Sequence, residues 1–308
     1  MTTAHMKVRN GIWLRRAYHQ ARSRAFSFSP VRRLGSLFSS APPASFSVAA
    51  CTSIGQVRRN NQDAFGYNRS VQTFLVCDGM GGAAGGDLAS RLAVETVLDT
   101  MLDGERVLRS IAAQNDQAQQ WEREEMEAAI DAANHAIYER SQKHAGLCGM
   151  GTTLVMLRLA GRLAHLAHVG DSRAYLFRKA ELQRLTLDHS LVEEQLRLGL
   201  ICPEQAQRAP YRNMITRALG TEPMVAADYT EVALLPGDLL LLVTDGLTNE
   251  LDDAALASLL RAATAQPVEG QSRSAEEAAL KGLCSTLVEA ANRHGGRDNI
   301  TCLLVRIA

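Results

Sequence analysis

The sequence contains no apolar run that approaches the roughly 18 residues of a membrane-spanning helix, and its first residues lack the apolar core of a signal peptide. Its six cysteines are scattered, with no CxxC pair. Most of them lie inside apolar runs, where a free thiol packs as a small hydrophobic side chain. These absences predict a soluble chain in the reducing cytoplasm and not a disulfide scaffold.

Acidic side chains are absent from residues 1–45, although this segment contains eight Lys or Arg residues. It is rich in Ser and Ala and has three prolines toward its end, so we predict a mostly disordered extension that leads into a linker. Three interpretations stay open for it: a solvated tail, a contact arm for an anionic surface or acidic partner, and an upstream mis-assigned start codon.

The remaining residues, 46–308, hold 25 basic and 33 acidic residues, a net charge of −8. This mildly acidic body argues against nucleic acid as the main partner. Over the whole chain, 46% of residues are hydrophobic and 21% are charged, which is ordinary for a soluble globular protein. A chain of 308 residues can also bury a substantial core.

Hydrophobic periodicity predicts alternating strands and helices from Phe46 onward. The predicted strands are 45–51, 64–68, 73–77, 152–159, 163–169, 173–178, 232–235, 239–243 and 300–307. The predicted helices are 86–101, 121–143, 253–265 and 274–294. Two helices follow the early strands and two precede the last strand. This order favours a sheet packed on a sheet with helices outside, rather than a parallel βαβ repeat.

Four aspartates stand beside a glycine or asparagine, or end a short polar stretch: Asp63, Asp78, Asp245 and Asp298. Each alone is weak, because Asp-Gly is a common turn pair. However, Asp78 and Asp245 both end strand-like apolar runs, and rigid strand ends can hold a metal site accurately. Four carboxylates in one site cannot all stay ionised without cations, and oxygen ligands favour Mg²⁺ or Mn²⁺ over Zn²⁺. The sequence therefore predicts a metal enzyme.

The chain resembles bacterial members of the metal-dependent Ser/Thr protein phosphatases, type 2C class, from about Thr52 to Val305. Eight segments occur in the family's order: Gly55–Asp63, Asp78–Gly82, Gly149–Thr153, Gly170–Arg173, Thr186–Ser190, Ile215–Gly220, Thr244–Leu247 and Gly296–Thr301. The resemblance implies an α+β fold, a four-layer αββα sandwich of two antiparallel sheets flanked by helices. Residues 46–308 would form the catalytic domain.

The resemblance also implies two metal ions per active site, Mn²⁺ or Mg²⁺, in a channel at one edge of the two sheets. The residues that match the family's metal ligands are the bridging Asp63 and Asp78, the backbone carbonyl of Gly79, and Asp245 with Asp298 on the other side. Arg58 matches the family's phosphate-holding arginine. A planar guanidinium can grip two phosphoryl oxygens at once.

The expected reaction is hydrolysis of phosphoserine and phosphothreonine in proteins. A phosphate monoester dianion repels anionic nucleophiles, so its uncatalysed hydrolysis is very slow. Two metals roughly 4 Å apart can hold a bridging water and make hydroxide available near neutral pH. We expect this hydroxide to attack phosphorus in line while Arg58 and the metals absorb charge on the equatorial oxygens. Cys77 is predicted to be structural, because strand alternation turns it away from Asp78.

The chain departs from the family pattern at several positions. Met80 and Ala83 stand where relatives carry histidines, so the group that protonates the leaving serine oxygen is unassigned. Gln62 replaces a frequent glutamate and can still hydrogen-bond to the metal ligands. His189 is interpreted as a structural turn histidine.

A third metal is doubtful, because Cys148 stands where relatives have a partner aspartate. The alternative is a third site formed by Asp188 with Asp245. Asp171 is expected to hold a turn, through a pair with Arg173.

Residues 189–214 correspond to the family's flap beside the active site. They either contact the protein substrate or form a solvated surface helix. The leading hypothesis is an active monomeric phosphatase that acts on phosphoproteins and reverses a bacterial Ser/Thr kinase. A catalytically dead scaffold should have lost a metal aspartate or the arginine, and all five are present. A regulator that acts on an anti-sigma antagonist would be favoured by an attached sensor or coiled coil, whereas this chain has only the basic extension.

Overall fold

The computed structural model describes residues 45–111, 118–264 and 272–308. The described residues all belong to one compact unit. The predicted extension, residues 1–45, lies outside the described residues except for Ser45. Among the described residues, no helix combines the length and apolar character that crossing a bilayer requires.

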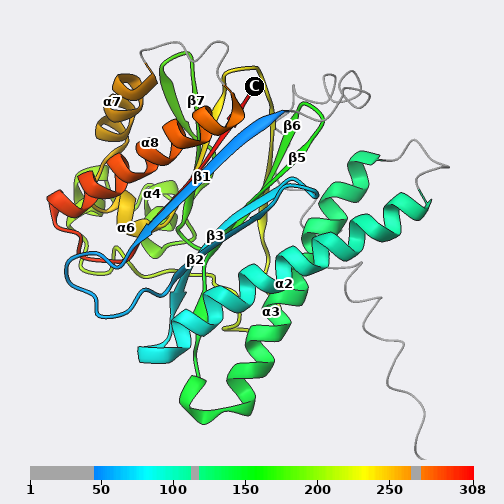
Figure 1. Ribbon diagram of the computed structural model, residues 1–308. Helices are drawn as coiled ribbons and strands as arrows, with labels where there is room; N and C mark the ends of the chain where they lie inside the picture. The colour runs from blue at the N-terminus through cyan, green and yellow to red at the C-terminus, as the bar shows by residue number, and fades with distance from the viewer. Residues whose placement is uncertain (1–44, 112–117, 265–271) are drawn as a thin grey trace, which may run out of the picture. The chain divides into compact units, whose positions relative to one another are not determined.

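Two antiparallel sheets form the centre of this unit (Figure 1). The first has the order β1 (Phe46–Ser53), β11 (Ile300–Ile307), β10 (Leu239–Val243), β7 (Arg173–Arg178) and β8 (Glu181–Arg184). The second has the order β2 (Asp63–Asn68), β3 (Thr73–Met80), β5 (Leu154–Ala160), β6 (Leu163–Val169) and β9 (Asp228–Ala233), with β4 (Gly151–Thr152) paired to β3. Neighbouring strands alternate in direction throughout, as hairpins and meanders allow.

Helices cover the outer face of each sheet (Figure 1). The pair α2 (Gly82–Ile111) and α3 (Ala118–Lys143) packs on the second sheet, and the pair α7 (Asp253–Thr264) and α8 (Arg273–His294) packs on the first. Shorter elements are the 3₁₀ turn η3 (Ala145–Leu147), α4 (Leu191–Arg197), α5 (Pro203–Arg208) and α6 (Asp245–Thr248). The predicted αββα sandwich is confirmed.

Three apolar layers hold this sandwich together, one between the sheets and one under each helix pair. β10 belongs to two of them: Leu240 and Leu242 face the other sheet, whereas Leu239 and Leu241 face α7 and α8. A strand buried on both faces has a continuous apolar sequence, which is why β10 was predicted from the sequence.

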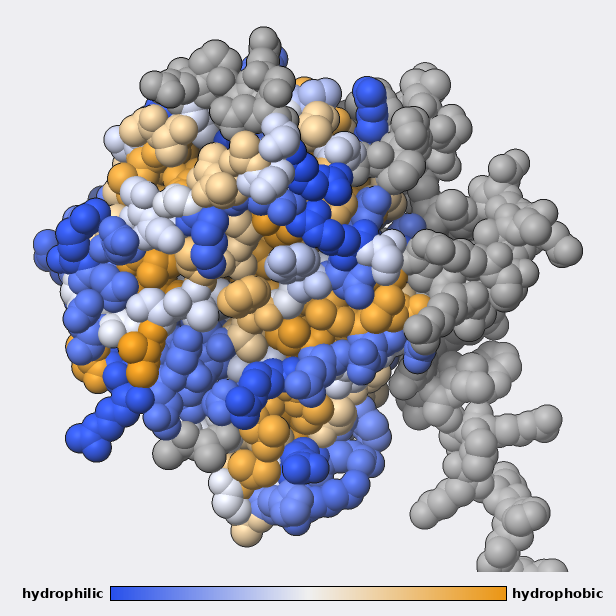
Figure 2. Space-filling view, in the orientation of Figure 1, coloured by the Kyte–Doolittle hydropathy of each residue, from blue (hydrophilic) through white to orange (hydrophobic). Residues whose placement is uncertain are grey.

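On the outer surface of the molecule, a band of hydrophilic side chains follows α2 (Figure 2).

The predicted helix 86–101 is longer in the structure, where α2 spans Gly82–Ile111, and three strands also differ from the sequence-based prediction. The predicted strand 152–159 is interrupted at Thr153, whose backbone N–H donates to the Asp78 carbonyl at 2.8 Å. The predicted strand 232–235 lies at 228–233, because β9 is a sheet edge whose side chains are mostly half-buried or exposed. β8 was not predicted, and it too is a half-exposed edge strand. Edge strands carry a weak apolar signal because one side meets solvent.

Candidate active site

A pocket of about 540 Å³ opens where strand ends of both sheets meet. The first sheet contributes residues after β10 and before β11, and the second contributes residues at the end of β3 and after β6. The loop before β2 and the segment after α5 complete the wall. The residues that line the pocket include Arg58, Gln62, Asp78, Gly79, Met80, Asp171, Asn213, Ile215, Asp245 and Asp298.

Asp63 and Asp78 lie directly opposite each other on β2 and β3. Opposite residues of an antiparallel pair project from the same face of the sheet, so the two carboxyl groups are neighbours. Cys77 pairs with Ala64, the next position along, and is buried in the layer under α2. The predicted structural role of Cys77 is confirmed by this placement.

Two threonine hydroxyls hold one oxygen of Asp63. Thr244 Oγ1 donates to Asp63 Oδ2 at 2.9 Å, and Thr301 Oγ1 donates to the same oxygen at 2.7 Å. Since Thr301 uses its proton on Asp63, the 2.8 Å contact between Thr52 Oγ1 and Thr301 Oγ1 has Thr52 as donor. Asn61 Nδ2 in turn donates to Thr52 at 2.8 Å. These donors all point toward Asp63.

Sequence reasoning missed this threonine pair. The available signal was position in the sequence: Thr244 directly precedes Asp245, and Thr301, the second residue of strand β11, follows three residues after Asp298. The Thr301 backbone N–H also donates to Thr244 Oγ1 at 2.9 Å, so the two hydroxyls are fixed relative to each other. The pair thereby links the predicted aspartates of one sheet to Asp63 of the other.

Burial and mutual repulsion raise the pKa values of the carboxyl groups in this site. Burial, opposed by the two threonine hydrogen bonds, raises the pKa of Asp63 to about 7, and the charges of Asp245 and Asp298 add to the rise. The pKa of Asp78 is raised well above its ordinary value by burial and by the charges of Asp63 and Asp245. Burial and the charge of Asp298 raise the pKa of Asp245. Without cations, the site resists full ionisation.

Within the carboxylate cluster of this site, two buried oxygens have no hydrogen-bond partner among the described residues: Asp63 Oδ1 and Asp245 Oδ1. Buried polar atoms are normally satisfied, so these two unpaired carboxylate oxygens of neighbouring residues indicate a missing ligand. Hard divalent cations prefer carboxylate, carbonyl and water oxygens, and several negative charges offset their own charge. The residues present therefore fit divalent metal ions of the Mg²⁺ or Mn²⁺ kind.

Gly79 is needed for the backbone approach beside these carboxylates. A Cβ at this position would lie 2.0 Å from the Gly86 carbonyl oxygen and 2.6 Å from that of Gln62. The Gly79 N–H donates to the Gln62 carbonyl at 3.1 Å, and Gln62 Nε2 donates to the Gly82 carbonyl at 2.7 Å. This network holds the turn after β3 against the loop that enters β2.

Arg58 lies at the mouth of the pocket. Its Nη2 donates to Asp298 Oδ2 at 2.6 Å, and half of its side chain is exposed. An exposed ion pair of this kind contributes at most about 1 kcal/mol, so the guanidinium can exchange Asp298 for another anion at little cost. The structure thus brings together Arg58 and all four predicted aspartates.

The expected pair between Asp171 and Arg173 is wrong. Arg173 instead binds Asp188, with Nε 3.0 Å from Oδ1 and Nη2 2.7 Å from Oδ2. Arg184 donates to the same carboxylate, so Asp188 is occupied by two guanidinium groups and is a poor partner for Asp245 in a third metal site. Asp171 lines the pocket, and burial together with the Asp245 charge raises its pKa to about 8.

The flap, residues 189–214, is partly helical and reaches the pocket wall at its end. It forms the two short helices α4 and α5, with the Ser190 hydroxyl accepting the Glu193 N–H at 3.2 Å as the N-cap of α4. Its end also reaches the pocket, since Asn213 lines the wall together with the following Ile215. Met80 lines the pocket as well, whereas the side chain of Ala83 lies outside the described part of the chain.

Comparison with known proteins finds consistent similarities. The family profile described as Protein phosphatase 2C matches residues 52–283. Protein phosphatase PhpP of Streptococcus pneumoniae serotype 2 is 35% identical over 265 residues, which cover 84% of this chain and 96% of PhpP.

Two solved structures extend the comparison to the fold. The serine/threonine phosphatase Stp1 from Staphylococcus aureus has a TM-score of 0.72 and 30% identity, covering 87% of this chain and 97% of Stp1. The catalytic domain of the serine/threonine protein phosphatase PstP, solved in complex with two manganese ions, has a TM-score of 0.69 and 30% identity, covering 85% of this chain and 98% of that chain.

Proposed function

The chain belongs to the protein phosphatase 2C family, and we propose that its acidic pocket is the active site of a metal-dependent protein-serine/threonine phosphatase. The observation that carries this assignment is the meeting of Asp63, Asp78, Asp245 and Asp298 at strand ends of both sheets, with two buried oxygens left unpaired. Such a cluster is unfavourable alone and favourable around divalent cations.

Five groups would hold two ions, either Mn²⁺ or Mg²⁺: the carboxylates of Asp63, Asp78, Asp245 and Asp298 and the backbone carbonyl of Gly79. When bound, the ions supply an activated water and positive charge that stabilises the transition state. The chain's own contribution is orientation. The threonine pair holds Asp63 Oδ2 and leaves Oδ1 free for an ion. The four negative charges also make the pocket selective for cations.

Arg58 is the proposed phosphate-binding residue. Its planar guanidinium can bind two phosphoryl oxygens at once. The ion pair with Asp298 holds this guanidinium beside the pocket, where a phosphate group could replace the carboxylate. The leaving serine oxygen needs a proton, and the thioether of Met80 has none to give. That proton therefore comes from water in the pocket or from another group.

We extend the proposal to the cellular role. Substrates would be phosphoproteins, and the enzyme would reverse phosphorylation by a bacterial Ser/Thr kinase as a cytoplasmic monomer. Residues 46–308 would be the catalytic domain, with residues 189–214 as the flap that meets the substrate. The solved structures of Stp1 and PstP, which are named as serine/threonine phosphatases, support the substrate class, and the pocket wall formed by Asn213 and Ile215 supports the flap assignment.

The test compares hydrolysis of a small aryl phosphate and of a phosphothreonine peptide, with and without Mn²⁺, by the full chain and by Asp245→Asn. We expect turnover of both substrates only with Mn²⁺ and loss of turnover in the variant. Equal rates with and without metal would reject the proposed mechanism. Binding of the phosphopeptide without turnover would favour the scaffold alternative.

A further inference from the structure

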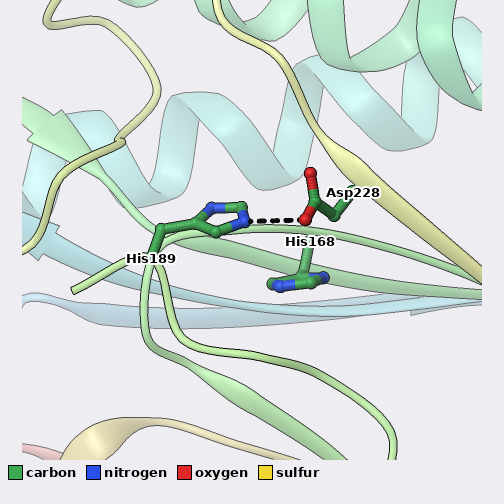
Figure 3. A group of neighbouring side chains, drawn as sticks. All are labelled: His168, His189 and Asp228. Atoms are coloured by element: carbon green, nitrogen blue, oxygen red, sulfur yellow. Dashed lines mark ion pairs between the residues drawn. The ribbon is translucent and has the colours of Figure 1, made fainter. Parts of the chain in front are cut away.

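Three side chains outside the pocket resemble a metal site at first sight. One ligand-type atom each from His168, His189 and Asp228 lies within 4.8 Å of the others. The residues come from β6, from the start of the flap and from β9, and the two imidazole rings stack 4.6 Å apart (Figure 3). In a metal-dependent enzyme the obvious assignment is another cation. The hydrogen bonds point elsewhere.

Both ring nitrogens of His189 are already engaged. The Gly170 backbone N–H donates to His189 Nδ1 at 3.1 Å, which requires a lone pair on Nδ1. A neutral imidazole then carries its proton on Nε2, and this nitrogen lies 3.4 Å from Asp228 Oδ2 (Figure 3). Neither nitrogen offers a free lone pair to a metal.

A guanidinium lies beside the same carboxylate. Arg217 Nη1 donates to Asp228 Oδ1 at 2.9 Å and to the Ala226 carbonyl at 3.3 Å, which uses both of its protons. Its 3.2 Å approach to His189 Nε2 is therefore a contact between two donors that share Asp228. A positive charge at this distance disfavours a second cation.

Two hydrogen bonds connect His189 to the turn that precedes Asp171 in the pocket wall. His189 N–H donates to the Gly170 carbonyl at 2.9 Å, so the two residues exchange hydrogen bonds in both directions. Gly170 has φ of +100° and packs tightly on Thr153, because a Cβ would lie 2.6 Å from Thr153 Cγ2. The next residue, Asp171, lines the pocket.

On the other side, His189 holds the base of the flap. Its carbonyl accepts the Thr216 N–H at 2.7 Å, and Ser190 forms a bridge with Ile215. Ile215 lines the pocket. One buried residue thus contacts the turn that carries Asp171 and the segment that carries Ile215.

We propose that His189 is a positioning residue of the phosphatase reaction. Asp228 favours the His189 tautomer with its hydrogen on Nε2. Nδ1 can then accept from Gly170 and hold the turn that carries Asp171, while the His189 backbone holds the base of the flap that carries Ile215. Together these bonds fix the distance between the two walls of the pocket. This inference rests on the proposed function for its catalytic meaning, but the tautomer and its hydrogen bond are tested independently.

The first experiment is ¹⁵N-edited NMR of the His189 ring in the full chain, assigned by comparison with His189→Asn. We expect the signature of an Nε2-protonated neutral imidazole in wild type, and a shift of the Gly170 amide proton in His189→Gln, which lacks an acceptor at the position of Nδ1. An Nδ1-protonated ring would overturn the proposal. This measurement needs no enzymatic activity, so it remains decisive if the protein fails to hydrolyse any phosphate ester.

The second experiment uses two substitutions that each keep one half of the ring's chemistry. The amide oxygen of His189→Asn can occupy the place of Nδ1 and accept from Gly170, whereas the amide nitrogen of His189→Gln can reach Asp228 but leaves Gly170 N–H without its acceptor. We expect His189→Gln to lower kcat/KM for a phosphothreonine peptide at least about tenfold, and His189→Asn to lower it by no more than about threefold.

A role in folding alone predicts a different pattern. In that case the two variants would lose melting temperature and kcat/KM in proportion, with no advantage for asparagine, and the proposal would be overturned. Failure of the proposed function would instead show as an inactive wild type with the expected tautomer. Tight binding of Zn²⁺ by wild type that His168→Ala abolishes would restore the metal-site assignment and also overturn the proposal.

Discussion

Asp63 on β2 and Asp78 on β3 are register partners in one antiparallel pair, and this pairing sets the carboxylate geometry of the site. A slip of one residue would turn every side chain of β2 to the other face. The register is specified by the two faces of β2: Phe65 packs between the sheets, whereas Ala64 packs under α2 and Gly66 lies against α2, where a Cβ would come 2.4 Å from Val94 Cγ1. Core packing thereby positions the proposed catalytic centre.

The threonine pair should control metal affinity. Thr301→Val keeps the shape of the side chain but removes the donor to Asp63 Oδ2, leaving a buried carboxylate oxygen less well oriented. Removal of a partner that orients a metal ligand typically lowers metal affinity about 10–100-fold, and we expect that range for Mn²⁺ measured by calorimetric titration. Thr301→Ser, which keeps the hydroxyl, is the control. Equal affinity of the valine variant and wild type would show that the hydroxyl does not orient Asp63.

Arg58 should act on substrate and not on metal. Arg58→Ala removes a charged donor to the phosphoryl group, and hydrogen bonds to charged groups contribute about 1.5–3 kcal/mol, so we expect kcat/KM for an aryl phosphate to fall roughly 10–100-fold. Affinity for Mn²⁺ should not fall, because the same substitution frees Asp298 from its ion pair. Arg58→Lys should restore little, since lysine lacks the planar fork. A large loss of Mn²⁺ affinity in Arg58→Ala would contradict this assignment.

The metal-free protein should lose stability as pH rises. The pKa values of Asp63 and Asp171 are raised from 3.8 to about 7 and about 8, so between about pH 4 and pH 8 the folded state holds protons that the unfolded chain has released. The free energy of unfolding therefore decreases through this window. Divalent ions bind the ionised carboxylates and release those protons, so the gain in Tm on adding Mn²⁺ should increase with pH.

Calorimetric melting with EDTA or with Mn²⁺, across this pH range, tests that expectation. Asp63→Asn is the matched control, because it removes one of the raised pKa values and should flatten the pH dependence of the metal-free Tm. A metal-free Tm that rises from about pH 5 to pH 8 would contradict the expected direction of this pH dependence.

Two glycine substitutions should have opposite effects on stability. In Gly79→Ala the new methyl would overlap the backbone carbonyls of Gly86 and Gln62, and overpacking of this kind typically costs about 1–3 kcal/mol or more. Gly282 is exposed on α8 with open space around its Cβ position, so Gly282→Ala should stabilise by roughly 0.5–1 kcal/mol. Urea unfolding measures both. A neutral Gly79→Ala would show that the turn after β3 can move.

The sequence was informative where a residue's role depends on its own neighbours. β10 and β11 are buried on both faces, so their apolar runs identified them, and the aspartates at or beside the ends of β3, β10 and β11 were recognisable from local motifs. The order of strands and helices was enough to predict the layers. The edge strands β8 and β9 gave less signal, because their exposed sides carry polar residues.

Interactions between distant segments could not be read in the same way. The Thr301 hydroxyl donates to Asp63, which is 238 positions away in the sequence. No local sequence pattern distinguishes Thr301 from any other threonine in a strand. Arg173 lies two residues after Asp171 in the sequence, but its side chain points toward Asp188 and binds that carboxylate instead. The direction of the side chain, which the sequence does not show, determines which aspartate it contacts. Local reasoning therefore selected four aspartates that the structure brings close together, and it missed the threonines that hold Asp63.

The carboxylates come from both layers of β-structure, with Asp63 and Asp78 from one and Asp245 and Asp298 from the other. The carboxylates of the two sheets repel one another when they are ionised, and ions held as proposed would link the two sheets through them. A cell short of manganese and magnesium would then hold this protein in a looser form whose opening begins between the two sheets. Metal supply would thus influence how quickly proteases remove the enzyme, as well as how fast it works.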